Sequence, residues 1–284
     1  LRAVDTDTQA QAAVVLRNLS VNVQSKVRIV KEGGLPPLID LLSSDSDKVQ
    51  EQAAVVIRNL ASSSDNEPKI IEAGAHGITV HPRPDQRHIR ADDLSDLAEI
   101  TKELEVEFNV EGNPYEDRLG EYPGFLNLIE SVKPSQCTLV PDDSNQLTSD
   151  HGWNIHSEHN KLVEVLDYLK INKIRSSIFL GPDKSQLDAA KEIGVDRIEI
   201  YTGPFAEAFK KNDETILNTY KDAIEYANNI GLEVNAGHDL NLENLPTLLS
   251  YGLIKEVSIG HALITESLIY GIENTVQKYI KITS

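Results

Sequence analysis

Histidine and glutamate side chains stand at or just after the ends of short β-branched runs in this sequence. His81 ends the run ITVH, Glu111 ends EFNVE, and His238 and His261 follow the runs EVN and EVSI. An imidazole titrates near neutral pH, and burial can raise the pKa of a carboxyl group toward the same range. A lone histidine is more often a hydrogen-bonded structural residue. Several at equivalent strand ends favour a site for general acid–base chemistry.

A compact cationic turn follows the first of these runs and contains Arg83, Arg87 and His88. The chain as a whole has a formal net charge of −18. A substrate phosphate or carboxylate would need such a local positive field, although a solvated loop is an equally weighted interpretation. Further along, Gly260 precedes a helical pattern, whose free backbone N–H groups could receive a phosphate.

Three other side chains have both a chemical and a structural interpretation. Cys137 could be a nucleophile, but no base is near it in sequence, so we favour a core position. Trp153 and Tyr201 could stack on an aromatic ring during its formation, and here too we favour plain packing.

From residue 77 onward, short apolar runs alternate with longer amphipathic stretches. We expect strands at Ile78 to His81, Glu107 to Glu111, Gln136 to Val140, Ser176 to Leu180, Arg197 to Tyr201, Glu233 to Asn235 and Glu256 to Ile259. We expect helices at Asp92 to Leu104, Lys161 to Leu169, Lys184 to Ile193, Glu214 to Ile230 and Ile264 to Tyr279. This order predicts an α/β fold, a TIM (β/α)8-type barrel with seven recognisable strands. The alternative, an open doubly wound sheet, would need a glycine-rich turn after its first strand, and there is none.

The first 75 residues instead contain an internal repeat. AAVVLRNLS at residues 12–20 returns as AAVVIRNLA at residues 53–61. Apolar residues at Ala13, Leu16 and Leu19 share one helical face, as do Ile57 and Leu60 in the second copy. We therefore predict an all-α repeat segment over residues 1–75 and a barrel over residues 76–284.

Composition excludes several classes of function. Acidic residues outnumber basic ones by 45 to 27, which argues against a nucleic-acid surface. No apolar run is long enough for a membrane span, and the single cysteine excludes an intrachain disulfide. We expect a soluble cytoplasmic protein with no nucleic-acid or membrane partner.

Five motifs, in order, resemble the pyridoxine 5′-phosphate synthase family over about residues 74 to 284. They are ITVHPRPDQRHI, EFNVEGNP, TLVPDDSNQLTSDHGW, NAGHDLNLENL and SIGHA. The resemblance implies condensation of 1-deoxy-D-xylulose 5-phosphate with 3-amino-2-oxopropyl phosphate to give pyridoxine 5′-phosphate, phosphate and water. It also implies a barrel homo-oligomer without metal or organic cofactor.

The resemblance also implies a role for each matched residue. His81 and Glu111 match proton acceptors, and His238 matches a proton donor. Arg83, His88 and Thr148 match contacts to the sugar phosphate, Gly260 and His261 match a phosphate-binding turn, and Asp239 stands where some members have a glycine that touches the amino ketone.

The repeat segment resembles armadillo repeats, in which asparagines of the third helix line a groove for extended peptides. Asn18 and Asn59 stand at that position, although helix-capping or solvated asparagines are the favoured interpretation. A peptide-interaction module on a non-catalytic barrel is therefore the alternative function.

The family's first strand and helix have no counterpart in this sequence. The seven remaining strands would leave two unpaired edges, so we expect weakened or absent turnover unless the N-terminal segment or another chain fills the gap.

Overall fold

The computed structural model describes residues 6–20, 28–29, 33–34, 37–38, 41, 44, 46, 48–50, 52–53, 55–56, 67–87, 89–143, 146 and 148–284. The chain divides into two compact units, Leu1–Lys69 and Ile70–Ser284.

The first unit contains α1 (Thr6–Leu19) and further helical residues in the described part. Ala10 and Ala13 of α1 are buried, three residues apart on one face, whereas Leu19 is 47% exposed. The predicted apolar face of this helix is therefore correct at Ala13 but does not extend to Leu19. One buried cluster contains Ala10, Ile29, Leu38, Leu41, Val49, Ala53 and Val56. Ile57, Asn59 and Leu60 lie outside the described residues.

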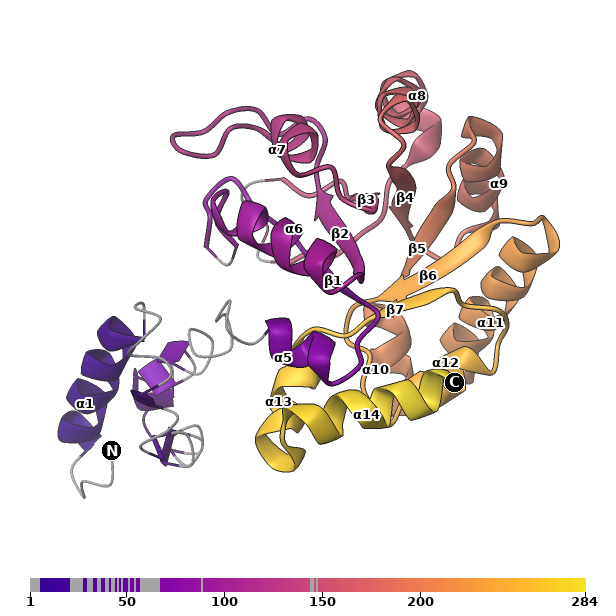
Figure 1. The fold of residues 1–284 in the computed structure, drawn as a ribbon. Helices are drawn as coiled ribbons and strands as arrows, with labels where there is room; N and C mark the ends of the chain where they lie inside the picture. Colours follow the sequence, from indigo (N-terminus) through magenta and orange to yellow (C-terminus); the bar gives the residue numbers. More distant parts are fainter. Residues whose placement is uncertain are drawn as a thin grey trace. The chain divides into compact units, whose positions relative to one another are not determined.

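The second unit is built on seven parallel strands in sequential order (Figure 1). They are β1 (Gly77–Val80), β2 (Glu107–Gly112), β3 (Gln136–Leu139), β4 (Arg175–Leu180), β5 (Arg197–Tyr201), β6 (Glu233–Gly237) and β7 (Glu256–Ser258). Each predicted strand is present, with ends shifted by no more than two residues. The register pairs Thr79 with Asn109 and Glu199 with Asn235.

Helices precede, connect and follow the strands, and those between strands cover the outside of the sheet (Figure 1). They are α5 (Glu67–Glu72), α6 (Asp93–Glu103), α7 (Phe125–Val132), α8 (Ile155–Ile171), α9 (Lys184–Ile193), α10 (Gly203–Lys211), α11 (Glu214–Asn229), α12 (Leu245–Leu249), α13 (His261–Tyr270) and α14 (Ile272–Thr283). The single helix predicted from Ile264 to Tyr279 is wrong, because Gly271 has φ 80° and separates α13 from α14.

The sheet curls into a nearly closed barrel. Side chains from strands far apart in the sheet meet inside it: Gln136 Nε2 on β3 donates to Glu256 Oε1 on β7 at 3.2 Å. Strand alternation separates the two faces, so apolar residues such as Ile178 and Ile198 pack beneath the helices, while polar residues fill the interior. The predicted TIM-type barrel with seven strands is confirmed. Among the described residues, β1 pairs only with β2 and β7 only with β6.

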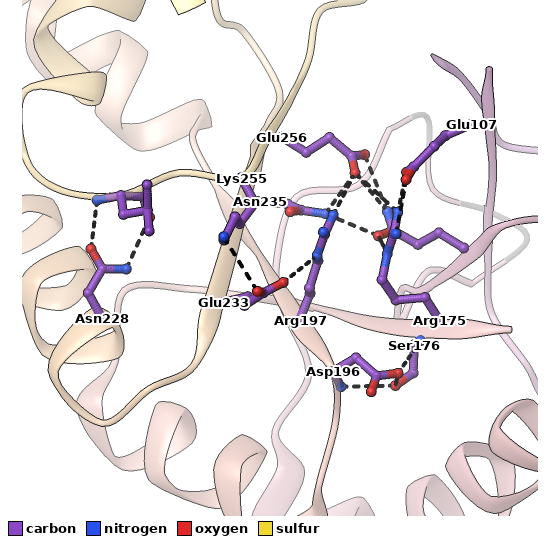
Figure 2. Close-up of polar contacts among 12 residues, drawn as sticks. Glu107, Arg175, Ser176, Asp196, Arg197, Asn228, Glu233, Asn235, Lys255 and Glu256 are labelled. Atoms are coloured by element: carbon purple, nitrogen blue, oxygen red, sulfur yellow. Dashed lines mark hydrogen bonds and ion pairs between the residues drawn. The ribbon is translucent and has the colours of Figure 1, made fainter. Parts of the chain in front are cut away.

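Ion pairs join the N-terminal ends of the strands (Figure 2). Arg197 Nε lies 2.9 Å from Glu233 Oε2, and its Nη1 lies 3.2 Å from Glu256 Oε2. Arg175 Nη1 donates to Glu107 Oε1 at 3.0 Å. The guanidinium of Arg175 lowers the pKa of Glu107, whereas burial raises the pKa of Glu256. In such barrels this end contributes stability, and reactive groups belong at the opposite end.

None of the helices in the described part of the chain has the length and apolar character needed to cross a membrane.

Candidate active site

His81 and Glu111 meet at the C-terminal ends of β1 and β2. These strands are neighbours in register, so the residue after β1 and the inward residue near the end of β2 lie on the same side of the sheet. His81 Nδ1 lies 3.9 Å from Glu111 Oε2, and the Glu111 side chain is only 10% exposed. The sequence placed both residues at one barrel mouth, and the structure brings them together.

Glu199 on β5 faces Glu111 from across the barrel and interacts with it as a hydrogen-bonding partner. Burial raises the pKa of Glu111 to about 7, and the bond from Glu199 limits that rise. Burial, together with the nearby Glu111 charge, raises the pKa of Glu199 well above its usual range. Two carboxyl groups held this closely share protons, so the pair can hold and release a proton near neutral pH.

Gly237 on β6 lets the backbone approach this pair closely. A Cβ there would lie 2.1 Å from Glu199 Oε1, well inside van der Waals contact. A larger residue at position 237 would therefore displace the Glu199 carboxyl group from the position that it has here.

His238 follows β6 in a turn with unusual backbone angles. Its φ is 82° and that of Asp239 is 57°, and side chains rarely adopt this left-handed region. The Thr202 hydroxyl lies within hydrogen-bond distance of the Gly237 and His238 carbonyl oxygens, and Asn244 Nδ2 donates to the Asp239 carbonyl at 3.0 Å. Such local strain, held by surrounding bonds, is frequent at functional sites.

The His238 ring packs against two aromatic rings. Its centroid lies 5.0 Å from that of Phe179 and 5.5 Å from that of Tyr201. Desolvation lowers the pKa of His238, and the charges of Asp142, His261 and Arg83 also act on it. The lowered pKa favours the neutral ring, and the ring lies within electrostatic range of groups from three other strand ends.

Arg83 is anchored by a buried carboxylate. Its Nη2 lies 2.5 Å from Asp142 Oδ2, and the Ser149 hydroxyl donates to the same oxygen at 2.6 Å. Arg83 is 8% exposed and Asp142 is 3% exposed. A small recess beside them is lined by His81, Arg83, Asn113, Glu116, Tyr122 and Asp142.

The remaining residues of the predicted phosphate contacts lie in different environments. Gly260 caps α13 and has no neighbouring atom within 4 Å of an added Cβ, and His261 is exposed at the first turn. Thr148 is exposed in the loop after β3, and Asp239 is also exposed. His88 lies outside the described residues. Arg87 Nη1 lies 3.2 Å from Asp85 Oδ2, and Arg87 Nη2 donates to the Gln146 carbonyl. The guanidinium of Arg87 therefore has partners within the loops themselves.

The structural interpretations favoured for Cys137 and Trp153 agree with their surroundings. Cys137 is fully buried, and burial raises the pKa of its thiol far above neutral. Trp153 is 7% exposed, and its Nε1 donates to the Leu139 carbonyl at 2.9 Å. Tyr201 is only half-buried and stands edge-on to His238, so its ring borders the site rather than the core.

Sequence reasoning missed Glu199 and Asp142. Glu199 is the polar residue in the middle of the run RIEIY, where a buried strand otherwise carries apolar side chains, and that interruption was the available signal. Asp142 follows a strand directly in VPDD, but nothing in the sequence indicates which of the two aspartates turns inward. Among the described residues, no group of three or more histidine, cysteine or acidic side chains is arranged to hold a metal ion.

A parallel α/β barrel with histidine and carboxyl side chains at its C-terminal strand ends defines an enzyme of the TIM-barrel class. The family described as pyridoxal phosphate biosynthesis protein PdxJ matches residues 63–284. The chain belongs to this family.

Curated relatives support the same assignment. A protein named pyridoxine 5′-phosphate synthase from Xanthomonas axonopodis pv. citri is 47% identical over 213 residues, which is 74% of this chain and 83% of that protein. A protein of the same name from Christiangramia forsetii is 45% identical over 210 residues, covering 74% of this chain and 84% of its own.

More distant comparisons concern the fold or the first unit alone. Tryptophan synthase from M. tuberculosis aligns with TM-score 0.54 at 11% identity, covering 79% of this chain and 88% of that chain. Thiamine phosphate pyrophosphorylase from Pyrococcus furiosus aligns with TM-score 0.50 at 14% identity, covering 77% and 87%. The armadillo/beta-catenin-like repeat family matches residues 22–62.

Proposed function

We propose that the second unit carries the pyridoxine 5′-phosphate synthase reaction, in which 1-deoxy-D-xylulose 5-phosphate and 3-amino-2-oxopropyl phosphate condense to pyridoxine 5′-phosphate. The observation that carries the proposal is the group of His81, Glu111 and His238 at one barrel mouth, in a chain 47% identical to synthases over 213 residues. Imine formation, loss of water and ring closure all need proton transfers, and these residue types supply them.

Glu111 and His81 are the proposed proton acceptors. A carboxyl group whose pKa is raised to about 7 is partly deprotonated at neutral pH, so it can remove a proton and release it again. His81, whose Nδ1 is 3.9 Å from Glu111 Oε2, can exchange protons with it after a small approach. Glu199 supports this role, because its hydrogen bond to Glu111 limits the rise of the Glu111 pKa and so keeps that pKa close to neutral pH.

His238 is the proposed second proton-transfer group, on the opposite side of the mouth. Its lowered pKa leaves the ring neutral, so it must first accept a proton before it can act as the donor that the family resemblance implies. Asp239, beside it, is the proposed contact to the amino ketone.

The phosphate contacts are proposed at two places. Arg83, with His88 and Thr148 in the neighbouring loops, is assigned to the sugar phosphate. Gly260 and His261 begin α13, where backbone N–H groups without helical partners attract an anion. No metal or organic cofactor is required by this assignment.

Activity of the purified full chain tests the proposal. Incubation with both substrates should form pyridoxine 5′-phosphate, detected by chromatography, and His238→Ala should reduce the rate by about 10²- to 10⁴-fold. His151→Ala changes an exposed histidine paired with Asp150 and serves as the matched control. Equal product formation by the parent and His238→Ala would contradict the assignment.

A second function is proposed for the first unit because the armadillo-like family matches residues 22–62. In this interpretation Asn18, exposed on α1, and Asn59 bind an extended peptide. Binding of a peptide library by the full chain, lost in Asn18→Ala and Asn59→Ala, would support it.

A cytoplasmic location and a barrel homo-oligomer are part of the proposal, and analytical ultracentrifugation tests the homo-oligomer.

A further inference from the structure

In the described part of the chain, the curled sheet has two edges, β1 and β7, that each pair with one neighbour only. Among the described residues, no backbone hydrogen bond joins β1 to β7, although contacts such as Gln136 to Glu256 show that the sheet folds round on itself. A closed barrel gives every strand two neighbours, and an unpaired edge exposes a row of backbone donors and acceptors.

The hydrogen bonds to the paired neighbours indicate which backbone groups face the opening. The Glu107 N–H donates to the His76 carbonyl at 3.0 Å, and the Lys255 N–H donates to the Val234 carbonyl at 2.7 Å. Backbone groups of successive strand residues point to alternate sides. The residues whose N–H and C=O groups point to the opening are therefore Gly77, Thr79, Glu256 and Ser258.

Apolar side chains on the β7 side of this opening are incompletely covered. Val257, Ile259 and Leu263 pack against the core but remain only partly buried. Helix α13 has no buried residue, and its Ile269 is 74% exposed. The other long helices of this unit each bury several side chains, so the helix layer is incomplete next to β7.

A contact between α14 and the segment before β1 lies beside the same opening. Gln277 Nε2 of α14 donates to the Ala73 carbonyl at 2.7 Å, just before β1 begins. The second helix after β7 is thereby attached to the segment that enters β1. Both edges belong to one compact unit.

We propose that this opening binds one parallel β-strand of a separate polypeptide. The strand would alternate apolar residues, facing Val257 and Ile259, with polar residues facing Thr79 and Ser258 in the polar interior. Its C-terminal end would lie beside His81, so the partner would complete the mouth of the barrel. The inference rests on the proposed function, because that mouth is the assigned active site.

The class of donor follows from the relatives. The Xanthomonas synthase extends beyond the matched region by about one sixth of its length, since 83% of it is covered. That remainder is long enough for a strand and a helix, which is the unit that a seven-stranded barrel lacks. The occupant is therefore the unmatched segment of a synthase chain, supplied in trans.

Hydrogen exchange on the full chain tests the inference without substrates. A synthetic peptide of the unmatched segment of the Xanthomonas relative should slow exchange about tenfold or more at the amides of Gly77, Thr79, Glu256 and Ser258, and leave β4 unchanged. A scrambled peptide of the same composition is the control. No binding, or protection elsewhere, would overturn the proposal, as would edge protection that depends on protein concentration alone.

A matched pair of variants tests the geometry. Ser258→Pro removes an N–H that faces the opening and leaves the ladder to β6 intact, whereas Ser258→Ala retains that N–H. Ser258→Pro should weaken peptide binding about tenfold, and Ser258→Ala about twofold or less. Circular dichroism confirms that both variants fold. Equal affinities would overturn the inference, whereas binding without product would contradict only the proposed function.

Discussion

Glu111 and Glu199 are two buried carboxyl groups from opposite sides of one barrel. Folding raises the pKa of both groups, so the folded state binds more protons than the unfolded state above about pH 4.5. Their contribution to stability is therefore complete below that pH. The contribution of Glu111 is lost as pH rises through about 7, and that of Glu199 is lost as pH rises through its own raised pKa. The raised pKa values that suit the pair to proton transfer therefore also lower the stability of the folded state at alkaline pH.

Glu199→Gln should reduce this pH dependence. At pH 8 the variant should be more stable than the parent by about 1–3 kcal/mol, and at pH 5 the difference should be small. Thermal midpoints measured by circular dichroism between pH 5 and 8 check this expectation. Glu192→Gln, at an exposed position of α9, is the control and should follow the parent. A parallel pH profile for parent and Glu199→Gln would disprove the shared-proton interpretation.

Asp142 is the buried counter-charge of Arg83, and its removal should destabilise the folded state. Asp142→Asn leaves a guanidinium only 8% exposed without its ion pair, which should lower the free energy of unfolding by about 3–5 kcal/mol. Asp143→Asn changes the exposed neighbour and should leave the urea midpoint unchanged. If both variants unfold at the same urea concentration, Asp142 does not anchor Arg83.

At the scale of elements, the N-terminal ends of the strands carry ion pairs, and the C-terminal ends carry the candidate site. The first residues of β4 and β5 are the arginines that hold the ion pairs of Figure 2, and the last residues lead into the loops of the candidate site. The strands were predictable because their β-branched runs are buried and short. The break at Gly271 was missed because helical residues stand on both sides of it, and a single glycine is tolerated within a helical pattern.

Arg197→Ala tests the ion pairs at the strand starts. Its side chain is 15% exposed and bonds both Glu233 and Glu256, so the loss leaves two acidic groups close together. We expect a decrease of about 2–4 kcal/mol in the free energy of unfolding, measured in urea. Lys211→Ala breaks a solvent-exposed pair with Glu207 and should have no resolvable effect. A similar midpoint for both variants would show that the cluster adds no stability.

At the scale of the whole molecule, the described residues form two buried clusters with no residue in common. The division predicted near residue 75 assigns them to a helical repeat segment and a barrel, and remains to be tested. Fewer than three repeats rarely form a stable solenoid core. The first unit should therefore unfold at the lower temperature.

Scanning calorimetry of the full chain tests this division. Leu38→Asp, at a fully buried position of the first unit, should remove the lower transition and leave the upper one within about 2 °C. Leu94→Asp in α6 should remove the upper transition instead. A single transition that either variant abolishes would contradict two separately folding units.

The sequence by itself determined the strand order, the barrel class and the position of His81, Glu111 and His238 at strand ends. It could do so because local periodicity encodes strands and helices, and parallel strands bring their ends to one edge. Only the tertiary structure decided that Glu199 meets Glu111, that Asp142 rather than Asp143 turns toward Arg83, and that Gln136 on β3 meets Glu256 on β7. Those facts depend on contacts across the barrel between residues far apart in the chain, and no local pattern of residues records such distances.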